Sequence, residues 1–314
     1  MNSASRIFIA GHNGMVGSAI LRCLDHNSYK NIFTASSKQI DLRDSAQTKS
    51  FFQKAKPEYV FLAAARVGGI QANIDSPADF LYDNIMIQTN VIHQAWMHKV
   101  KKIIVLGSSC IYPKDCPQPM KEEYLLTGKL EPTNEGYALA KIVALKQAEY
   151  YYRQFGFKAI SVMPPNLYGP NDSFDLKTSH VLSALVRRFH DAKETNTPDV
   201  TLWGTGSARR EFMHVDDVAE ALFFMMENYD SPDFINIGCG TDISIKELAI
   251  LIAKKVGYGG EIKWDSSKPD GMLRKCMDVS RMKAAGFMPK IHLETGIENM
   301  ISEYRKINKG KGNI

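Results

Sequence analysis

The stretch RIFIAGHNGMVG at residues 6–17 decides the fold. Its first half, Ile7–Ala10, is an uninterrupted apolar run of the kind found in buried strands. Its second half carries three glycines in the pattern G-x-x-G-x-x-G, after which a helix is predicted from about Met15 to Leu24. Glycines placed between a strand and a helix permit a tight turn and let a pyrophosphate approach the backbone at the positive helix N-terminus. The stretch therefore predicts a dinucleotide-binding unit.

Apolar runs and helical patterns continue to alternate after this unit. The predicted strands are 32–35, 59–63, 102–107 and 158–163, and the predicted helices are 44–54, 79–98 and 135–155. Near-continuous apolar strands that alternate with helices indicate a parallel sheet covered on both faces. We therefore predict an α/β fold, with a Rossmann-like doubly wound parallel sheet in an NADP-binding domain over residues 1–172.

The alternation loosens beyond residue 172, and we predict a smaller α/β C-terminal domain over residues 173–314 that mainly binds substrate. A segment near residues 212–239 is expected to return to the first domain. The predicted elements are helices at 179–193, 215–227 and 244–256, a short extended stretch at 201–204 and a strand at 234–237. The tail from residue 306 to 314, rich in Lys, Gly and Asn, is expected to fray.

Composition narrows the range of functions. The net charge of +5 is mild and its basic residues are scattered, so we expect a phosphate-bearing small ligand and no nucleic-acid partner. The five cysteines are widely spaced and contain no C-x-x-C, which favours a reduced, cytoplasmic setting over disulfides or a metal site. There is no signal-peptide pattern and no apolar run of bilayer length, so no membrane association is expected.

The cofactor's ribose is expected to lie at the end of the second strand. An NAD site would place Asp or Glu there, about 20 residues past the glycines. The chain instead reads Ser36-Ser37-Lys38, and the first acid, Asp41, comes late. Hydroxyls and a lysine suit a 2′-phosphate better than a ribose diol, although a plain polar turn would read the same way. We therefore expect NADP.

A second cluster of polar residues follows the fourth strand, where parallel sheets bind ligands. The segment Ser108–Pro113 reads SSCIYP, and Tyr137 and Lys141 stand four residues apart on the predicted helix 135–155. Residues at i and i+4 share one helix face. A lysine ammonium there is expected to lower the phenol's pKa, so that the Tyr can exchange a proton with a carbinol or ketone. The spacing alone also occurs by chance on exposed helices.

Together these motifs resemble the extended short-chain dehydrogenase/reductases and, more narrowly, the GDP-L-fucose synthase family among them. The resemblance covers nearly the whole chain. Its most specific segments are GSSCIYP at residues 107–113, NLYGP at 166–170, SHV at 179–181 and REFMHVDD at 210–217. The glycine and Tyr-Lys motifs are shared across the whole superfamily.

The resemblance implies an NADP-dependent enzyme that epimerises C3 and C5 of GDP-4-keto-6-deoxy-D-mannose and then reduces C4. Ser108, Tyr137 and Lys141 would be the reductase triad, with Lys141 also holding the nicotinamide ribose. Cys110 and His180 would be the base and the acid of epimerisation. The residues implied in binding the GDP-sugar are Ser109, Asn166, Arg188, Trp203, Arg210 and Asp270.

The resemblance also implies a set of cofactor contacts, with no metal. They are Gly11, His12, Asn13, Gly14, Met15, Val16, Gly17, Ser37, Lys38, Asp41, Leu42, Ala63, Ala64, Leu106, Gly107, Ser108, Tyr137, Lys141, Pro164, Asn166, Leu167 and His180. Three positions depart from the family. Asn13 and Ser37 stand where arginines would contact the 2′-phosphate, which weakens the implication of NADP. Gly136 replaces a bulkier residue and is expected to loosen the start of its helix.

A homodimer is also implied, built through a four-helix bundle of helices 79–98 and 135–155. Alternatives remain open at this point. A sibling with the same mechanism, a GDP-L-colitose synthase, would epimerise only C5 of a 3,6-dideoxy keto-sugar. A 4,6-dehydratase would need acidic residues where Ser109 and Cys110 stand, and a simple 4-epimerase would not need the Cys/His pair. A non-catalytic dinucleotide sensor would be expected to lose Tyr137 or Lys141.

Overall fold

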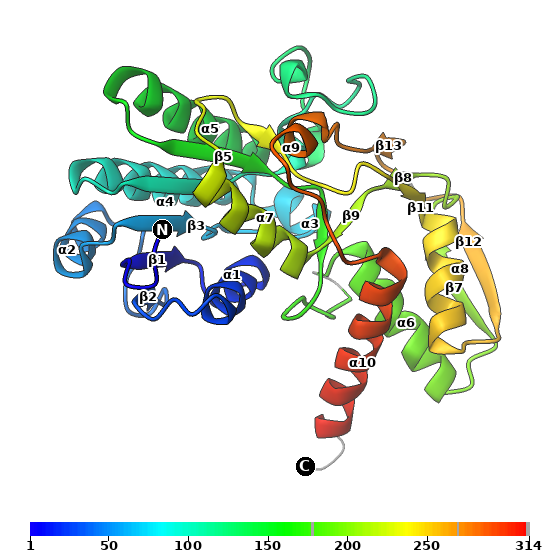
Figure 1. Cartoon of the computed structure of the whole chain (residues 1–314). Helices are drawn as coiled ribbons and strands as arrows, with labels where there is room; N and C mark the ends of the chain where they lie inside the picture. Colours follow the sequence, from blue (N-terminus) through cyan, green and yellow to red (C-terminus); the bar gives the residue numbers. More distant parts are fainter. Residues whose placement is uncertain (177–178, 269, 312–314) are drawn as a thin grey trace.

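The computed structural model describes residues 1–176, 179–268 and 270–311. A six-stranded parallel sheet lies at its centre, in the order β10-β5-β4-β3-β1-β2 (Figure 1). Its strands are β1 (Ile7–Ala10), β2 (Ile32–Ala35), β3 (Tyr59–Leu62), β4 (Lys102–Leu106), β5 (Ala159–Met163) and β10 (Ile235–Asn236). The predicted doubly wound α/β sheet is confirmed.

Helices cover both faces of this sheet (Figure 1). On one face, α1 (Met15–His26) packs against α7 (Val215–Asn228), and their apolar residues share a core with β1 and β5. On the other face, α2 (Ser45–Ala55), α4 (Pro77–Met97) and α5 (Glu135–Phe155) enclose a second core that includes Phe52, Val91 and Ala144. Because both faces are covered, the strands can be almost entirely apolar.

The order of strands in the sheet changes direction at β1: β2 lies on one side of it, and β3, followed by β4, lies on the other. Open α/β sheets bind ligands at such a switch point. The loops after β1, β3 and β4 therefore meet at one edge of the sheet. The remaining short elements on this side of the molecule are α3 (Ile70–Asp75), η1 (Ser109–Ile111), η2 (Glu122–Tyr124), η3 (Pro132–Asn134) and β6 (Asn166–Tyr168), which pairs with β9 (Phe212–His214).

A second lobe is built mostly from the C-terminal half of the chain. In it α6 (Val181–Glu194), α8 (Ile245–Val256) and α10 (Leu293–Lys311) pack together around a core of their own. The other elements of this lobe are the paired strands β7 (Asp199–Trp203) and β12 (Glu261–Asp265) and the sheet β11-β8-β13 (Ile243–Ser244, Arg209–Arg210, Arg274–Lys275). The short helix α9 (Ser280–Ala284) instead packs next to β10, and its Met282 belongs to the core of the parallel sheet. The division of the chain into two domains at residue 172 stays a prediction.

The expected fraying of the tail is wrong for residues 306–311, because α10 extends to Lys311. Its buried face, formed by Ile297, Met300, Ile301 and Tyr304, packs into the core of the second lobe and stabilises the helix against its polar composition. Residues 312–314 lie outside the described residues. No helix in the described part of the chain combines the length and the apolar character needed to cross a membrane.

Gly136 does not loosen the start of α5, contrary to expectation. The helix begins at Glu135, and a Cβ at Gly136 would lie 2.7 Å from the carbonyl oxygen of Pro77 at the start of α4. The glycine thus allows the first turns of α4 and α5 to approach each other closely.

Candidate active site

The glycine loop between β1 and α1 forms a backbone surface with no side chain in the way. Gly11 has φ +89°, and a Cβ there would lie 2.6 Å from the amide nitrogen of Ala64 in the loop after β3. A Cβ at Gly17 would lie 2.0 Å from the oxygen of Gly11. Gly14 caps α1 without any side-chain hydrogen bond, so the first amides of the helix remain available for a ligand. This arrangement fits a pyrophosphate.

The end of β2 offers the polar group expected for a 2′-phosphate. Ser37 and Lys38 are exposed there, and no ion pair or hydrogen bond occupies either side chain within the described residues. The Asp41 carboxylate, by contrast, is held by the Arg43 guanidinium at 2.8 and 2.9 Å, and Arg43 also binds Asp83. Asp41 is therefore an anchor for Arg43, which removes it as a free ribose ligand.

The Ser-Tyr-Lys group comes together at the carboxyl end of β4. Ser108 is the extended residue that precedes η1, and its Oγ accepts a hydrogen bond from the Cys110 amide at 3.4 Å. Tyr137, in the first turn of α5, is hydrogen bonded to the Ser108 side chain. Lys141 Nζ, one turn further along, donates to the Leu106 carbonyl oxygen at 2.8 Å and lies 5.7 Å from the Tyr137 ring centroid. The structure thus brings the three predicted reductase residues into one cluster.

The electrostatics of this cluster differ from the expectation. Burial, followed by the charge of Cys110, raises the pKa of Tyr137, and the Ser108 hydrogen bond only partly opposes this rise. Burial lowers the pKa of Lys141 to about 8. The expectation that Lys141 lowers the phenol's pKa is therefore wrong: Lys141 faces the ring and the Leu106 carbonyl. A protonated phenol at neutral pH is suited to donating a proton.

Cys110 lies within the same cluster, on the short helix η1 (Ser109–Ile111). Its side chain is 6% exposed, and Ser109 beside it is also buried, with its amide donating to the Pro164 carbonyl at 3.2 Å. Burial raises the pKa of the Cys110 thiol, while Lys275, the Ser108 hydrogen bond and Lys141 lower it. A buried thiol next to a phenol and a hydroxyl can serve as a proton acceptor if its thiolate is stabilised.

His180 comes from a different part of the molecule. It is the exposed N-cap residue of α6, and no contact joins it to Cys110 in the described part of the chain. The pKa of the Asp172 carboxyl is raised by burial, and this rise is opposed by a hydrogen bond from Ser183 and by the charge of His180. Asp172 was not predicted as a site residue, because an Asp in a Pro-Asn-Asp sequence looks like an ordinary turn residue. It can act as a partner for a protonated imidazole.

Two of the predicted sugar-nucleotide residues, Arg188 and Trp203, line a mostly apolar cavity of about 150 Å³ in the second lobe. The walls also include Ile245 and Trp264, which sequence reasoning missed because aromatic residues in a strand usually read as core. Trp203 is 69% exposed, and the Lys268 ammonium lies over its ring at 5.8 Å from the centroid, so the indole stands at the surface beside a cation.

Two more of the six predicted GDP-sugar residues, Arg210 and Asp270, lie near Trp203. The Asp270 carboxylate accepts from the Thr205 amide and hydroxyl at 2.7 Å each, in the turn that follows β7. Burial lowers the pKa of Arg210, and Asp270 opposes this. Asn166 is instead tied to backbone, donating to the Glu211 carbonyl at 2.9 Å. Six of the remaining predicted cofactor contacts stand in loops that follow strands: His12, Asn13, Leu42, Ala63, Gly107 and Pro164. The other four lie in regular elements: Met15 and Val16 begin α1, Leu106 ends β4 and Leu167 is in β6.

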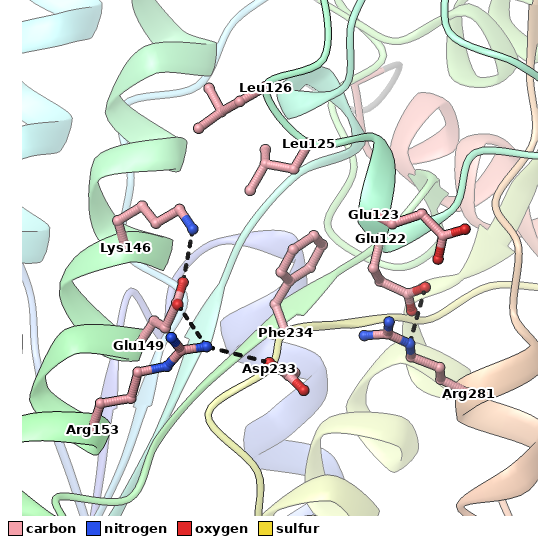
Figure 2. Close-up of a pocket in the computed structure, with 10 residues that line it drawn as sticks. All are labelled: Glu122, Glu123, Leu125, Leu126, Lys146, Glu149, Arg153, Asp233, Phe234 and Arg281. Carbon is pink, nitrogen blue, oxygen red and sulfur yellow. Dashed lines mark hydrogen bonds and ion pairs between the residues drawn. The ribbon is translucent and has the colours of Figure 1, made fainter.

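A larger cavity, of about 310 Å³, contains none of the predicted residues (Figure 2). It lies between α5, residues 122–126 and the 233–234 turn, and its charged walls are largely paired, as in Lys146–Glu149–Arg153 and Glu122–Arg281. Paired charges leave little for a ligand to bind. Within the described residues, no group of three or more His, Cys, Asp or Glu could hold a metal ion.

Comparison with known proteins finds similar chains of nearly the same length. GDP-L-fucose synthase 1 of Arabidopsis thaliana is 50% identical over 305 residues, covering 97% of this chain and 94% of that protein. GDP-L-fucose synthase of Escherichia coli K12 is 49% identical, covering 94% of this chain and 95% of the relative. GDP-L-colitose synthase of Yersinia pseudotuberculosis is 42% identical, with coverages of 93% and 95%.

Solved structures give the same picture. A GDP-D-glycero-L-gluco-heptose synthase from Campylobacter jejuni, crystallised in the presence of NADPH, has a TM-score of 0.91 and 36% identity, covering 98% of this chain and 99% of that chain. A GDP-L-fucose synthetase from Naegleria fowleri bound to NADP has a TM-score of 0.90 and 26% identity, with coverages of 98% and 96%. The family model described as "NAD dependent epimerase/dehydratase family" matches residues 7–238. This chain therefore belongs to the NAD dependent epimerase/dehydratase family.

Proposed function

We propose that this protein converts GDP-4-keto-6-deoxy-D-mannose to GDP-L-fucose, by epimerisation at C3 and C5 followed by NADPH-dependent reduction at C4. The observation that carries the proposal is the cluster at the end of β4. There a buried thiol, Cys110, accompanies the hydrogen-bonded pair Ser108 and Tyr137. A reductase needs the phenol and hydroxyl, whereas the thiol is the additional group that an epimerisation requires. The relatives at about half identity bear the same activity in their names.

NADP is the proposed cofactor. The backbone of Gly11, Gly14 and Gly17 leaves room for its pyrophosphate, and the exposed Ser37 and Lys38 supply donors for its 2′-phosphate. When bound, the reduced nicotinamide supplies the hydride that reduces C4. Neither Asn13 nor Ser37 provides a guanidinium, so Lys38 is the one cation that this segment offers to the phosphate.

Epimerisation beside a ketone requires removal of a C–H proton and return of a proton to the opposite face. The Cys110 thiolate accepts the proton, and the C–H electron pair moves into the carbonyl to form an enolate. Ser108 and Tyr137 donate hydrogen bonds to the enolate oxygen and stabilise its charge. His180, protonated, then donates a proton to the other face of the carbon.

The reduction uses the same phenol. Because burial keeps Tyr137 protonated at neutral pH, it can donate its proton to the C4 oxygen as that oxygen gains negative charge. Lys141 is fixed by its hydrogen bond to the Leu106 carbonyl, where it is proposed to hold the nicotinamide ribose. The GDP moiety is proposed to lie in the second lobe, with its base near Trp203 and Arg188 and its phosphates near Arg210.

We further propose that two copies associate through α4 and α5. These helices pack against each other, yet both expose apolar side chains, namely Tyr82 and Met97 on α4 and Leu139, Val143 and Tyr150 on α5. Pairing with the same face of a second copy would bury them in a four-helix bundle. Light scattering should then report twice the monomer mass, and a monomer at micromolar concentration would contradict this. The five free cysteines are consistent with the cytoplasm as its location.

Product analysis by NMR in D₂O tests the main proposal. With GDP-4-keto-6-deoxymannose as substrate, the NADPH absorbance should fall in step with the formation of GDP-L-fucose. The GDP-L-fucose should carry deuterium at C3 and C5. The rival colitose-type activity predicts turnover of the 3,6-dideoxy keto-sugar with deuterium only at C5. NADPH binding without turnover of either sugar would point to a sensor.

A further inference from the structure

Tyr112, the fifth residue of the segment SSCIYP, has no part in the proposed reaction, yet its hydroxyl is firmly held. The side chain is 2% exposed and lies in the core that the parallel sheet shares with α1 and α7. Its hydroxyl donates to Asn236 Oδ1 at 2.5 Å. A buried hydroxyl costs free energy unless it is hydrogen bonded, and a phenylalanine would fill the same space without that cost. Packing alone therefore does not account for a tyrosine at this position.

Asn236, which accepts this hydrogen bond, can take only one orientation. It lies fully buried in β10, the edge strand of the parallel sheet. Its Nδ2 donates to two carbonyl oxygens, that of Met120 at 3.0 Å and that of Asp278 at 3.2 Å. Its backbone amide donates to Glu122 Oε1 at 3.0 Å. Because Nδ2 faces two carbonyl oxygens, Oδ1 must face the Tyr112 hydroxyl, which is the donor.

The two carbonyl groups that hold Asn236 belong to segments paired with each other. The Met120 amide donates to the Cys276 carbonyl at 2.7 Å, and the Asp278 amide donates to the Met120 carbonyl at 2.8 Å. Met120 and Met277 form a parallel β-bridge. The Asn236 amide group is therefore bound to a set of backbone hydrogen bonds and is not free to turn.

Cys110, by contrast, stands in a turn whose own hydrogen bonds are long. The helix η1 is a single turn of three residues. The Ile111 amide donates to the Ser108 carbonyl at 3.3 Å, and the Cys110 amide donates to Ser108 Oγ at 3.4 Å. Both distances exceed the usual range of about 2.7–3.2 Å for an N–H···O hydrogen bond. The turn by itself therefore holds the Cys110 side chain weakly.

Contacts outside the turn fix its two ends. The end before Cys110 continues from β4, and the Ser109 amide donates to the Pro164 carbonyl at 3.2 Å. The end after Cys110 has the hydrogen bond between Tyr112 and Asn236. The position of the thiol depends on both anchors, and the second one belongs to a strand more than a hundred residues further along the chain.

We propose that Tyr112 and Asn236 are positioning residues for epimerisation, whose hydrogen bond fixes the turn that carries Cys110 and so aims the thiol at the C–H group of the sugar. The inference rests on the proposed function. Ser108 and Tyr137, which serve the hydride step, stand directly after β4 and in α5. Loss of the hydrogen bond should therefore impair proton removal from carbon far more than hydride transfer.

Three variants and one control test the pair. Tyr112→Phe removes the hydroxyl and keeps the ring that packs in the core, Asn236→Ala removes the acceptor, and the double variant completes the cycle. Tyr304→Phe is the matched control, because this tyrosine is 4% exposed and its hydroxyl donates to Asp191 Oδ1 at 2.8 Å in the second lobe.

Two rates are measured on each protein. The first is deuterium exchange at C3 and C5 of GDP-4-keto-6-deoxymannose in D₂O, with NADP⁺ in place of NADPH so that no reduction follows. The second is hydride transfer from GDP-L-fucose to NADP⁺, followed by the rise of NADPH absorbance. The quotient of exchange to hydride transfer does not depend on the concentration of folded enzyme, so a general loss of stability leaves it unchanged.

The quotient should fall by about tenfold or more in Tyr112→Phe, because a displacement of about 1 Å in a reacting group can cost about 10²-fold in rate. Asn236→Ala should show a similar fall, and the double variant should fall no further than either single variant, since all three lose the same hydrogen bond. Tyr304→Phe should keep the wild-type quotient even if its unfolding temperature is lower.

An unchanged quotient in Tyr112→Phe would overturn the inference, whether or not Asn236→Ala folds. Equal losses of the two rates would likewise overturn it and assign the hydrogen bond to stability alone. Additive falls in the double variant would show that the two side chains act separately. Failure of the proposed function has a different signature: a wild-type enzyme that exchanges no deuterium on either keto-sugar would refute that function, a result that no comparison among the variants produces.

Discussion

Cys110, at the end of β4, is 6% exposed, whereas Trp203, at the end of β7, is 69% exposed. The contrast extends to their surroundings. Ser108, Tyr137 and Lys141 are joined to each other or to backbone, while His180 and Trp203 face outward from the second lobe. Proton transfer by Cys110 and Tyr137 requires closely fixed groups, and these two belong to the cluster at the parallel sheet, whereas the second epimerisation residue, His180, stands at the open surface. Recognition of a large nucleotide requires an open surface.

The most damaging substitutions should be those of the proton-transfer pair, which has one member in each region. Cys110→Ser and His180→Gln should each reduce deuterium incorporation at C3 and C5 by about 10²–10⁴-fold, because each removes one general acid or base. NADPH binding, followed by fluorescence, should be retained in both.

Cys23→Ser and His26→Gln, both on α1, are matched controls that should leave exchange intact. If the exposed His180 proved dispensable while Cys110 did not, the acid would have to be sought among residues of the buried cluster.

A smaller effect is expected at the open surface. Trp203→Ala should raise the KM for the GDP-sugar about tenfold or more, because stacking of a base on an aromatic ring contributes about 1–3 kcal/mol. The kcat should change much less, and Trp203→Phe should retain most of the affinity. Steady-state kinetics at saturating NADPH provide the measurement. A loss confined to kcat would mean that the indole shapes the catalytic geometry, against the contrast drawn above.

The last prediction concerns stability rather than turnover, and it is made at Glu211, which lies between β8 and β9. Its buried carboxylate accepts from the amides of Gly240 at 2.7 Å and Met277 at 2.6 Å, and burial raises its pKa to about 7. The folded protein therefore retains a proton that the unfolded chain loses near pH 4.5, the ordinary pKa of a glutamate side chain. The stability that this proton provides is present in full below that value and is lost as the pH rises through about 7.

The free energy of unfolding should accordingly fall by up to about 3 kcal/mol through this one group between about pH 5 and pH 8. Glu211→Gln should flatten that dependence, whereas Glu123→Gln, at an exposed position, should leave it unchanged. Chemical denaturation across this pH range gives the slopes. Identical slopes in wild type and Glu211→Gln would show that another group dominates the titration.

Local signals predicted the first half of the chain well. The boundaries of β2 and α5 coincide with those expected, because α5 ends at Gly156 in the left-handed conformation and the apolar runs are bounded by polar turns. The proximity of the reductase residues also follows from local signals, since Tyr137 and Lys141 are one helix turn apart and Ser108 follows the end of a strand.

The second lobe was less predictable. The two-residue strands β8, β11 and β13 arise from pairing between distant segments and have no periodicity of their own. The helical tail is stabilised by Met300 and Tyr304 packing against α6 and α8, which its polar composition does not reveal. Lys275 stands in an ordinary Arg-Lys-Cys sequence, and only the pairing of β13 gives it a neighbour.

The sequence by itself determined the βα alternation, the glycine loop and the Tyr-Lys spacing, because each depends on residues within one or two elements. The tertiary structure alone decided that the Tyr137 phenol is protonated and that Asp41 is held by Arg43. These properties come from burial and from charges brought together by the fold, and no local pattern in the chain encodes either.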